Sequence, residues 1–121
     1  MVLVDSSVWI DHLRQKEPQL VQLLANNRVL IHPFIIGELA CGQIKNRQQF
    51  INLLSQLPAI DVAADTQVME CIEQQTLFSR GIGWVDAHLL TAVLLNNAHQ
   101  LWSRDKRLHN LTVDRQLAYL E

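Results

Sequence analysis

Short apolar segments alternate with helical segments along this chain, and this alternation restricts its fold more than any other feature. Residues 2–4 and 29–31 are brief apolar runs, and "AIDV" at 59–62 and "QLWS" at 100–103 are further candidate strands. A last short strand is expected at 117–119. Apolar strands alternating with helices are typical of a parallel sheet covered by helices on both faces, because such strands are buried on both sides. The sequence therefore predicts an α/β protein with a mostly parallel sheet.

Capping residues, prolines and glycines predict where the helices lie. Serine and aspartate favour the position before a helix, proline favours its first turn, and glycine favours the position just after its end. These signals predict helices from Ser7, capped by Ser6; from Pro18 to about 25; from Pro33 to near Gly42; over "RQQFINLLSQL" before Pro58; from Asp65 to about Ser79, with Gly81 as stop signal; over 85–97; and after Asp105.

Length and composition are those of a small globular protein. The 121 residues suit one domain, 1–121, and 49% hydrophobic against 18% charged residues are enough to build a buried core. The net charge is −2, from 12 acidic and 10 basic residues, which argues against a protein that coats DNA or membranes through bulk charge. A local basic patch remains compatible with this balance.

The sequence predicts a cytoplasmic protein. The first ten residues, "MVLVDSSVWI", lack the basic start of a signal peptide and contain Asp5. The most apolar run, "LLTAVLL", is far shorter than the ~20 residues that cross a bilayer. Cys41 and Cys71 lie in apolar helical patterns without CxxC spacing, so we expect free structural thiols rather than a disulfide or zinc site.

Four carboxylates fall where the predicted sheet would present a ligand site. Asp5 and Asp105 each follow a predicted strand, while Glu38 and Asp86 lie early in predicted helices. In open α/β sheets, ligands bind outside the carboxyl ends of the strands. The helices that carry Glu38 and Asp86 can return over this same edge, so the fold predicts that the four side chains converge.

Each of these residues also has a simpler explanation when it is considered alone. Asp5 and Asp105 are suitable helix caps, and Asp86 near a helix start gains about 0.3–1 kcal/mol from the helix dipole. Glu38 fits the solvated face of an amphipathic helix, although its neighbours are mostly apolar. Taken together, four converging like charges repel unless a cation neutralises them. Oxygen ligands of this kind suit Mg²⁺ or Mn²⁺, and such sites cleave phosphodiester bonds.

Four ordered stretches give the chain a family resemblance. These are "VLVDSSVWIDHL", "HPFIIGELACG", "GIGWVDAHLLTAVL" and "LWSRDKRL", which together span nearly the whole sequence. In this order and spacing, the chain resembles PIN-domain ribonucleases, specifically the VapC toxins of bacterial type II toxin–antitoxin pairs. The resemblance implies a three-layer α/β/α fold and Mg²⁺-dependent endoribonuclease activity, with Mn²⁺ as a possible substitute.

The resemblance also assigns roles to individual residues. Asp5, Glu38, Asp86 and Asp105 match the acidic positions of the family, which implies that all four are catalytic and hold metal. Asp5 and Asp86 are the expected direct ligands, and a metal-activated water is the expected attacking group. Ser103 matches a Ser or Thr position that supports the acidic cluster, and Ser6 matches the small hydroxyl residue after the first aspartate.

Partners follow from the same resemblance. It implies an RNA substrate, a homodimer, and a basic antitoxin protein whose arginines can enter the acidic pocket. The helices around 17–26 and 46–57 are candidate interfaces, although their apolar faces can equally belong to the core. The candidate phosphate-binding residues are Arg80, Arg104, Lys106 and Arg107, with an ordinary solvated surface as the alternative. Trp84 can stack on a base, but a packing role is favoured.

Other readings of the same residues are less favoured. An aspartate-based phosphotransferase usually has a second aspartate two residues after the first, where this chain has Ser7. A nucleotide-binding domain is also disfavoured, because the sequence contains neither of the glycine-rich phosphate-binding motifs GxGxxG and GxxxxGK[ST]. The histidines show no ligand spacing, and on a helix His88 points away from Asp86. A catalytically silent module that docks a basic peptide in the acidic pocket remains the alternative to a nuclease.

Overall fold

A three-stranded parallel sheet forms the centre of the structure, a computed structural model that describes residues 1–121. Its strands are β1 (Val2–Val4), β2 (Val29–Leu30) and β3 (Gln100–Trp102), in the order β2-β1-β3. The two outer segments predicted as strands are reduced to single parallel bridges, Ile31 to Ala59 and Leu101 to Ala118. The sheet is thus parallel throughout, as the alternation of strands and helices predicted.

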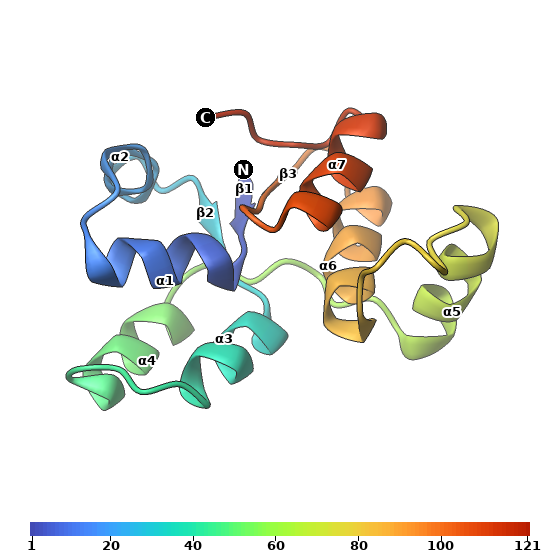
Figure 1. Ribbon diagram of the computed structural model, residues 1–121. Helices are drawn as coiled ribbons and strands as arrows, with labels where there is room; N and C mark the ends of the chain where they lie inside the picture. Colours follow the sequence, from blue (N-terminus) through green and yellow to red (C-terminus); the bar gives the residue numbers. More distant parts are fainter.

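Helices lie on both sides of this sheet (Figure 1). They are α1 (Ser6–Arg14), α2 (Pro18–Ala25), α3 (Pro33–Ala40), α4 (Arg47–Ser55), α5 (Asp65–Gln74), α6 (Trp84–Leu95) and α7 (Lys106–Asp114). The arrangement is a three-layer α/β/α fold, which confirms the predicted class. None of these helices has the length and apolar character needed to cross a lipid bilayer.

Helix α5 ends earlier than the sequence predicted, at Gln74 instead of Ser79. Thr76 adopts a left-handed conformation (φ 53°), and the Leu77 N–H donates to the Ile72 carbonyl at 2.9 Å. This bond closes a Schellman motif, and it returns Leu77 to the core, where it is buried. Glycine usually holds the left-handed position, so a threonine there hides the helix end from sequence inspection.

Helix α6 passes through the middle of the hydrophobic core. All residues from 87 to 93 are buried, and the main core cluster of 23 residues combines this helix with the three strands. A helix that is apolar on every face belongs in the interior. Its first turn, at Trp84–Asp86, is less buried than the turns that follow, so the rigid part of α6 supports an accessible end.

Candidate functional site

Asp5 leaves β1 directly into the predicted ligand edge. Its backbone N–H bonds to the Trp102 carbonyl at 2.9 Å, which ties it to the end of the neighbouring strand β3. Asp5 is the N-cap residue of α1, yet its side chain makes no capping hydrogen bond. The helix-cap explanation therefore does not account for this carboxylate, which is buried and oriented by other groups.

Two serine hydroxyls fix the orientation of the Asp5 carboxylate. Oδ2 accepts a hydrogen bond from Ser103 Oγ at 2.8 Å and another from Ser7 Oγ at 3.0 Å. Each hydroxyl is in turn held by a backbone N–H, from Asp105 to Ser103 Oγ and from Arg104 to Ser7 Oγ. The segment after β3 therefore controls how Asp5 points, while Oδ1 is left without a strong partner.

Glu38 reaches this site from the second turn of α3. Ser6 Oγ donates to Glu38 Oε1 at 3.2 Å and lies 3.5 Å from Asp5 Oδ1, so one hydroxyl bridges the two acids. Although much of Glu38 is exposed, partial burial of its carboxyl raises its pKa above the usual value. The negative charges of Asp5 and Asp86 raise this pKa further, while the Ser6 hydrogen bond lowers it.

Asp86 is the third residue of α6, in the first turn as predicted. Burial raises its pKa, and the charges of Asp5 and Asp105 raise it further. A hydrogen bond from the Gly83 backbone N–H has the opposite effect. Helix placement alone does not explain Asp86, since a residue that only stabilises the helix dipole gains nothing from being surrounded by other acids.

Asp105 combines both roles that the sequence left open. Its Oδ1 accepts hydrogen bonds from the backbone N–H groups of Arg107 and Leu108, at 3.0 and 3.1 Å, and so caps α7. Its charge also acts on Asp86. Asp105 is thus a helix cap placed within electrostatic range of Asp86.

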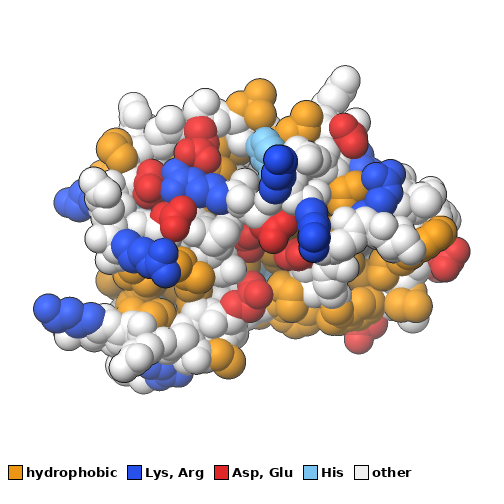
Figure 2. Space-filling view, viewed as in Figure 1, with side chains coloured by type: hydrophobic (Ala, Val, Ile, Leu, Met, Phe, Trp, Pro, Cys, Tyr) orange, Lys and Arg blue, Asp and Glu red, His pale blue; other side chains and the backbone are white.

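The four acids form a cluster that lacks a basic partner. No Lys, Arg or His side chain makes an ion pair with any of them, because the ion pairs of the structure involve other carboxylates. Figure 2 shows acidic side chains gathered in the middle of this face, in the hollow between the α3–α4 side and the α6–α7 side. No three of the molecule's His, Cys, Asp or Glu side chains are close enough together to hold a metal ion directly.

Comparison with known proteins resolves which family this arrangement belongs to. The PIN domain family matches residues 2–113, which include all four acids. The chain belongs to the PIN-domain family. It is also 41% identical over 121 residues to "Ribonuclease VapC32" from two strains of Mycobacterium tuberculosis, CDC 1551 / Oshkosh and H37Rv, covering all of this chain and 98% of each relative. The resemblance to VapC-type PIN domains is thereby confirmed.

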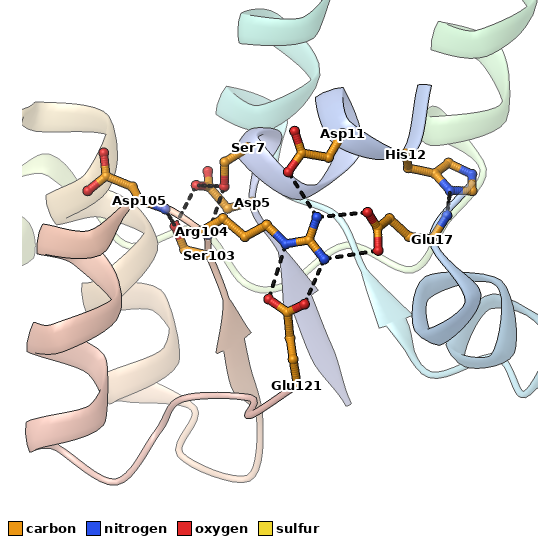
Figure 3. A network of polar contacts seen from close by, with 9 residues as sticks. All are labelled: Asp5, Ser7, Asp11, His12, Glu17, Ser103, Arg104, Asp105 and Glu121. Carbon is orange, nitrogen blue, oxygen red and sulfur yellow. Dashed lines mark hydrogen bonds and ion pairs between the residues drawn. The ribbon is translucent and has the colours of Figure 1, made fainter. Parts of the chain in front are cut away.

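A second group of acids lies beside the first in this PIN domain, and it surrounds Arg104 (Figure 3). The guanidinium donates to Glu17 through Nη1 and Nη2 at 2.8 and 3.0 Å, and to Glu121 through Nη2 and Nε at 2.6 and 3.1 Å. A fifth bond joins Nη1 to Asp11 at 2.9 Å. Five is the full donor capacity of arginine. Arg104, which the sequence suggested as a phosphate-binding residue, therefore has no N–H left for RNA.

The other candidate phosphate-binding residues remain exposed and free of ion pairs. Arg80 and Lys106 make no side-chain contact with an acid, and Arg107 Nη1 lies 3.4 Å from the Gly81 carbonyl. Trp84 packs edge-on against His88, with ring centroids 4.9 Å apart, and is 41% exposed. His88 is buried with Nε2 at 3.0 Å from Asp65 Oδ1, so it joins α6 to α5 and faces away from the acids.

Sequence inspection missed two parts of this region. In the sequence, Ser7 marks a helix start and argues against a phosphotransferase, yet in the structure it donates to Asp5 as Ser103 does. The pattern Asp-Ser-Ser was a usable signal, because a hydroxyl two residues after an aspartate often bonds back to it. The carboxylates around Arg104 come from α1, from the segment just after it and from the end of the chain, and no spacing rule connects them.

Proposed function

We propose that this PIN domain is a metal-dependent endoribonuclease and the toxin of a toxin–antitoxin pair, acting in the cytoplasm. The observation that carries the proposal is the convergence of Asp5, Glu38, Asp86 and Asp105 without a basic partner. Carboxylates gathered at one site repel one another unless a cation neutralises them. A site of this kind favours a divalent ion that the protein recruits from solution.

The donor set suits a hydrated Mg²⁺ or Mn²⁺ ion. Mg²⁺ keeps several waters and is usually held by one or two carboxylates, so three converging protein ligands are not required. Asp5 and Asp86 would hold the ion, with Oδ1 of Asp5 as the freer oxygen. A bound ion would lower the pKa of an attacking water and stabilise charge on the leaving oxygen.

The remaining residues position the substrate and the proton. The raised pKa of Glu38 suits it to take a proton from the attacking water. Asp105 completes the negative field, and Ser6 and Ser103 keep the acids in place. Lys106, Arg107 and Arg80 attract the phosphates on either side of the cleaved bond, because charged donors bind phosphate oxygens strongly.

Cleavage of structured RNA with purified protein tests this proposal. We expect cleavage with Mg²⁺ or Mn²⁺, none with EDTA, and products with 5′-phosphate ends. Asp5→Asn should lower the rate by about 10²–10³-fold, the usual effect of removing one electrostatic group from an active site. The matched control is Asp61→Asn, an exposed acid outside the cluster. Cleavage that survives EDTA, or equal rates for both variants, would contradict the proposal.

The antitoxin is proposed to dock on the groove between α1, α2 and α4. This groove has a volume of about 610 Å³ and is lined by apolar side chains that include Leu13 and Leu53, which are 44% and 66% exposed. It includes parts of the helices around 17–26 and 46–57, which the sequence suggests as candidate interfaces for a homodimer. An amphipathic segment of the antitoxin is the expected occupant, since a helix laid in an apolar groove is a common recognition mode.

Copurification tests the partner. The protein encoded beside this one should copurify with it and inhibit cleavage, and Leu53→Glu should abolish copurification while the isolated variant still cleaves RNA. Val113→Glu is the control, because it places the same charge on an exposed apolar site of α7.

A homodimer is proposed as well, and light scattering measures its mass in solution. If the wild-type protein never cleaves RNA but binds a basic peptide through its acids, the silent binding module is correct instead.

A further inference from the structure

A pocket lies between α1, α3 and the segment that joins α3 to α4, and it has a volume of about 370 Å³. Its charged lining residues are Arg14 at the end of α1, Glu38 on α3 and Lys45 in the joining segment. The pocket therefore places two basic groups and one acid around a shared space. Four of the nine lining residues are hydrophobic, namely Ile10, Leu13, Leu39 and Ile44.

The two basic residues of this pocket have no acidic partner. Arg14 and Lys45 are exposed, and neither forms an ion pair, although Glu38 lines the same pocket. The pKa of Glu38 is shifted by burial, by other acids of the cluster and by a serine hydroxyl, and neither cation acts on it. Both cations are therefore available to a ligand that enters the pocket.

Glu38 belongs to this pocket and to the acidic cluster at the same time. Its Oε1 accepts a hydrogen bond from Ser6 Oγ, which lies 3.5 Å from Asp5 Oδ1. Figure 2 shows basic side chains on both flanks of the acidic centre, over α1 on one side and beside α7 on the other. The pocket thus opens directly beside the acids, on the α1 side.

The lining of the pocket favours a ligand with repeated negative charge. Ile10 and Leu13 are 41% and 44% exposed, and apolar walls of this kind strengthen the field of nearby cations by lowering the local dielectric constant. A single carboxylate would satisfy the two cations, but it would leave nothing for the metal-binding acids next to Glu38. A nucleic-acid strand carries one anion per nucleotide and can engage both places at once.

We infer that Arg14 and Lys45 hold backbone phosphates of the RNA next to the cleaved linkage, on the α1 side of the acidic cluster. This inference rests on the proposed nuclease function and adds to it a phosphate-binding site that is separate from Lys106 and Arg107 at the start of α7. Leu13 and Lys45 also line the groove proposed for the antitoxin, so a partner seated in that groove covers part of this phosphate site.

The salt dependence of RNA binding tests the inference without relying on cleavage. The probe is a fluorescein-labelled, mixed-sequence single-stranded RNA of ~12 nucleotides, titrated in Mg²⁺ against the Asp5→Asn protein, which keeps the strand intact. Fluorescence anisotropy gives the affinity at each salt concentration. Each phosphate contact to a single strand contributes about 0.7 to the slope of log affinity against log salt concentration.

Removing both charges of the pocket should lower this slope. In the Asp5→Asn background, the double variant Arg14→Gln, Lys45→Gln should lose about 1.4 from the slope, for two contacts. A tenfold rise in salt should then cost this variant about 25-fold less affinity than it costs the parent protein. The double variant Arg14→Lys, Lys45→Arg should keep the parent slope, because both charges remain in place.

A matched control removes the same charges elsewhere. Lys16 and Arg28 are exposed, make no ion pair and lie outside the pocket. Arg28 directly precedes β2, at the edge of the sheet opposite the acids. The double variant Lys16→Gln, Arg28→Gln should therefore keep the parent slope, although its net charge equals that of the pocket variant.

Cleavage kinetics give a second measurement in the otherwise wild-type protein. Because the pocket holds phosphates that do not react, Arg14→Gln with Lys45→Gln should raise KM in proportion to the loss of affinity at the same salt concentration. The value of kcat should stay near that of the wild-type protein, as expected when ground state and transition state lose the same contact.

Two results would overturn the inference. One is a salt slope for the pocket variant equal to that of the control variant Lys16→Gln, Arg28→Gln. The other is unchanged RNA binding by the pocket variant together with loss of the copurifying partner, which would assign the pocket to an acidic segment of the antitoxin. Failure of the proposed nuclease function is seen separately, as absence of Mg²⁺-dependent cleavage by the wild-type protein.

Discussion

Two groups of carboxylates lie side by side in this PIN domain, and only one of them contains a cation of its own. Around Arg104, three carboxylates bind all five guanidinium N–H groups (Figure 3). Around Asp5, four carboxylates approach one another with serine hydroxyls between them and without a basic side chain. The same residue type thus serves two purposes within a short distance.

Two carboxyls in each group have shifted pKa values, and the shifts have opposite directions. Hydrogen bonds from Arg104 lower the pKa of Glu17 and of Glu121. Burial and neighbouring acids raise the pKa of Glu38 and of Asp86. A group of acids with its own arginine stabilises the fold, whereas a group without one is held together at a cost and gains from binding a cation. The two groups are linked, because the Arg104 backbone N–H also holds Ser7 against Asp5.

The largest expected effect comes from making the same chemical change in each group. Asp86→Asn should lower cleavage by about 10²–10³-fold and raise the melting temperature of the metal-free protein, because it removes a charge from a repulsive cluster. Glu17→Gln should keep cleavage near the wild-type rate and lower the melting temperature. Cleavage rates in Mg²⁺ and thermal unfolding in EDTA measure both. Stabilisation by Glu17→Gln, or destabilisation by Asp86→Asn, would show that the two groups do not differ as described.

Removal of the arginine itself should have the next largest effect. Arg104→Met leaves Asp11, Glu17 and Glu121 facing one another without a cation. The pairs are partly exposed, with side-chain exposures of 24% for Arg104 and 24–44% for its partners. We therefore expect a loss of about 1–3 kcal/mol of unfolding free energy, below the value for a fully buried pair. Urea denaturation measures it, with the exposed, unpaired Arg28→Met as control.

The sequence predicted the acids near Asp5 and not those near Arg104, and the reason lies in how each group is assembled. Asp5 and Asp105 follow strands, and Asp86 begins a helix, so their positions derive from secondary structure and sheet topology. Glu17 and Glu121 lie in a loop and at the chain end, where no periodicity fixes a side chain. A basic residue beside Asp105 is equally consistent with phosphate binding, which is the role that the sequence suggests for Arg104.

The end of α5 was misplaced for a related reason, whereas α2 ends at Ala25 as predicted. Helices α2, α5 and α7 are each followed by a left-handed residue that is not glycine, namely Asn27, Thr76 and Gln116. In each case a buried or backbone-bonded residue follows at once, so tertiary packing holds the strained conformation. The order of elements and the parallel sheet were predictable, because they depend on many apolar residues instead of one.

A smaller effect should follow from the link between the two groups. Ser7→Ala removes one of two hydroxyls on Asp5 Oδ2 and should lower cleavage by about 10-fold, the lower end of what is lost with an orienting partner. It should also weaken Mn²⁺ binding, measured by calorimetry in the absence of RNA. Ser7→Thr should restore both, since it returns the hydroxyl. The control is Ser55→Ala, whose hydroxyl bonds only to the Ile51 carbonyl in α4. Unchanged Mn²⁺ binding in Ser7→Ala would assign Ser7 a purely structural role.

The smallest expected effect is the pH dependence of the Arg104 group. Because the folded pKa of Glu17 and of Glu121 is below the ordinary 4.5, their stabilisation is complete above that value and is lost as the pH falls through the folded pKa. The gap in unfolding free energy between the wild-type protein and Arg104→Met should therefore be constant from about pH 6 to 8 and close below about 4.5.

For Asp86, the raised pKa gives the opposite sign: its contribution to stability is full below the ordinary pKa of 3.8 and is lost as the pH rises through the folded pKa. The unfolding free energy of Asp86→Asn should thus exceed that of the wild-type protein, by an amount that increases as the pH rises. Urea denaturation in EDTA measures this difference. The unfolding free energy of the variant minus that of the wild-type protein should therefore fall with rising pH for Arg104→Met and increase for Asp86→Asn. A change of the same sign in both differences would mean that a single electrostatic field, and not two separate groups, governs the acids of this domain.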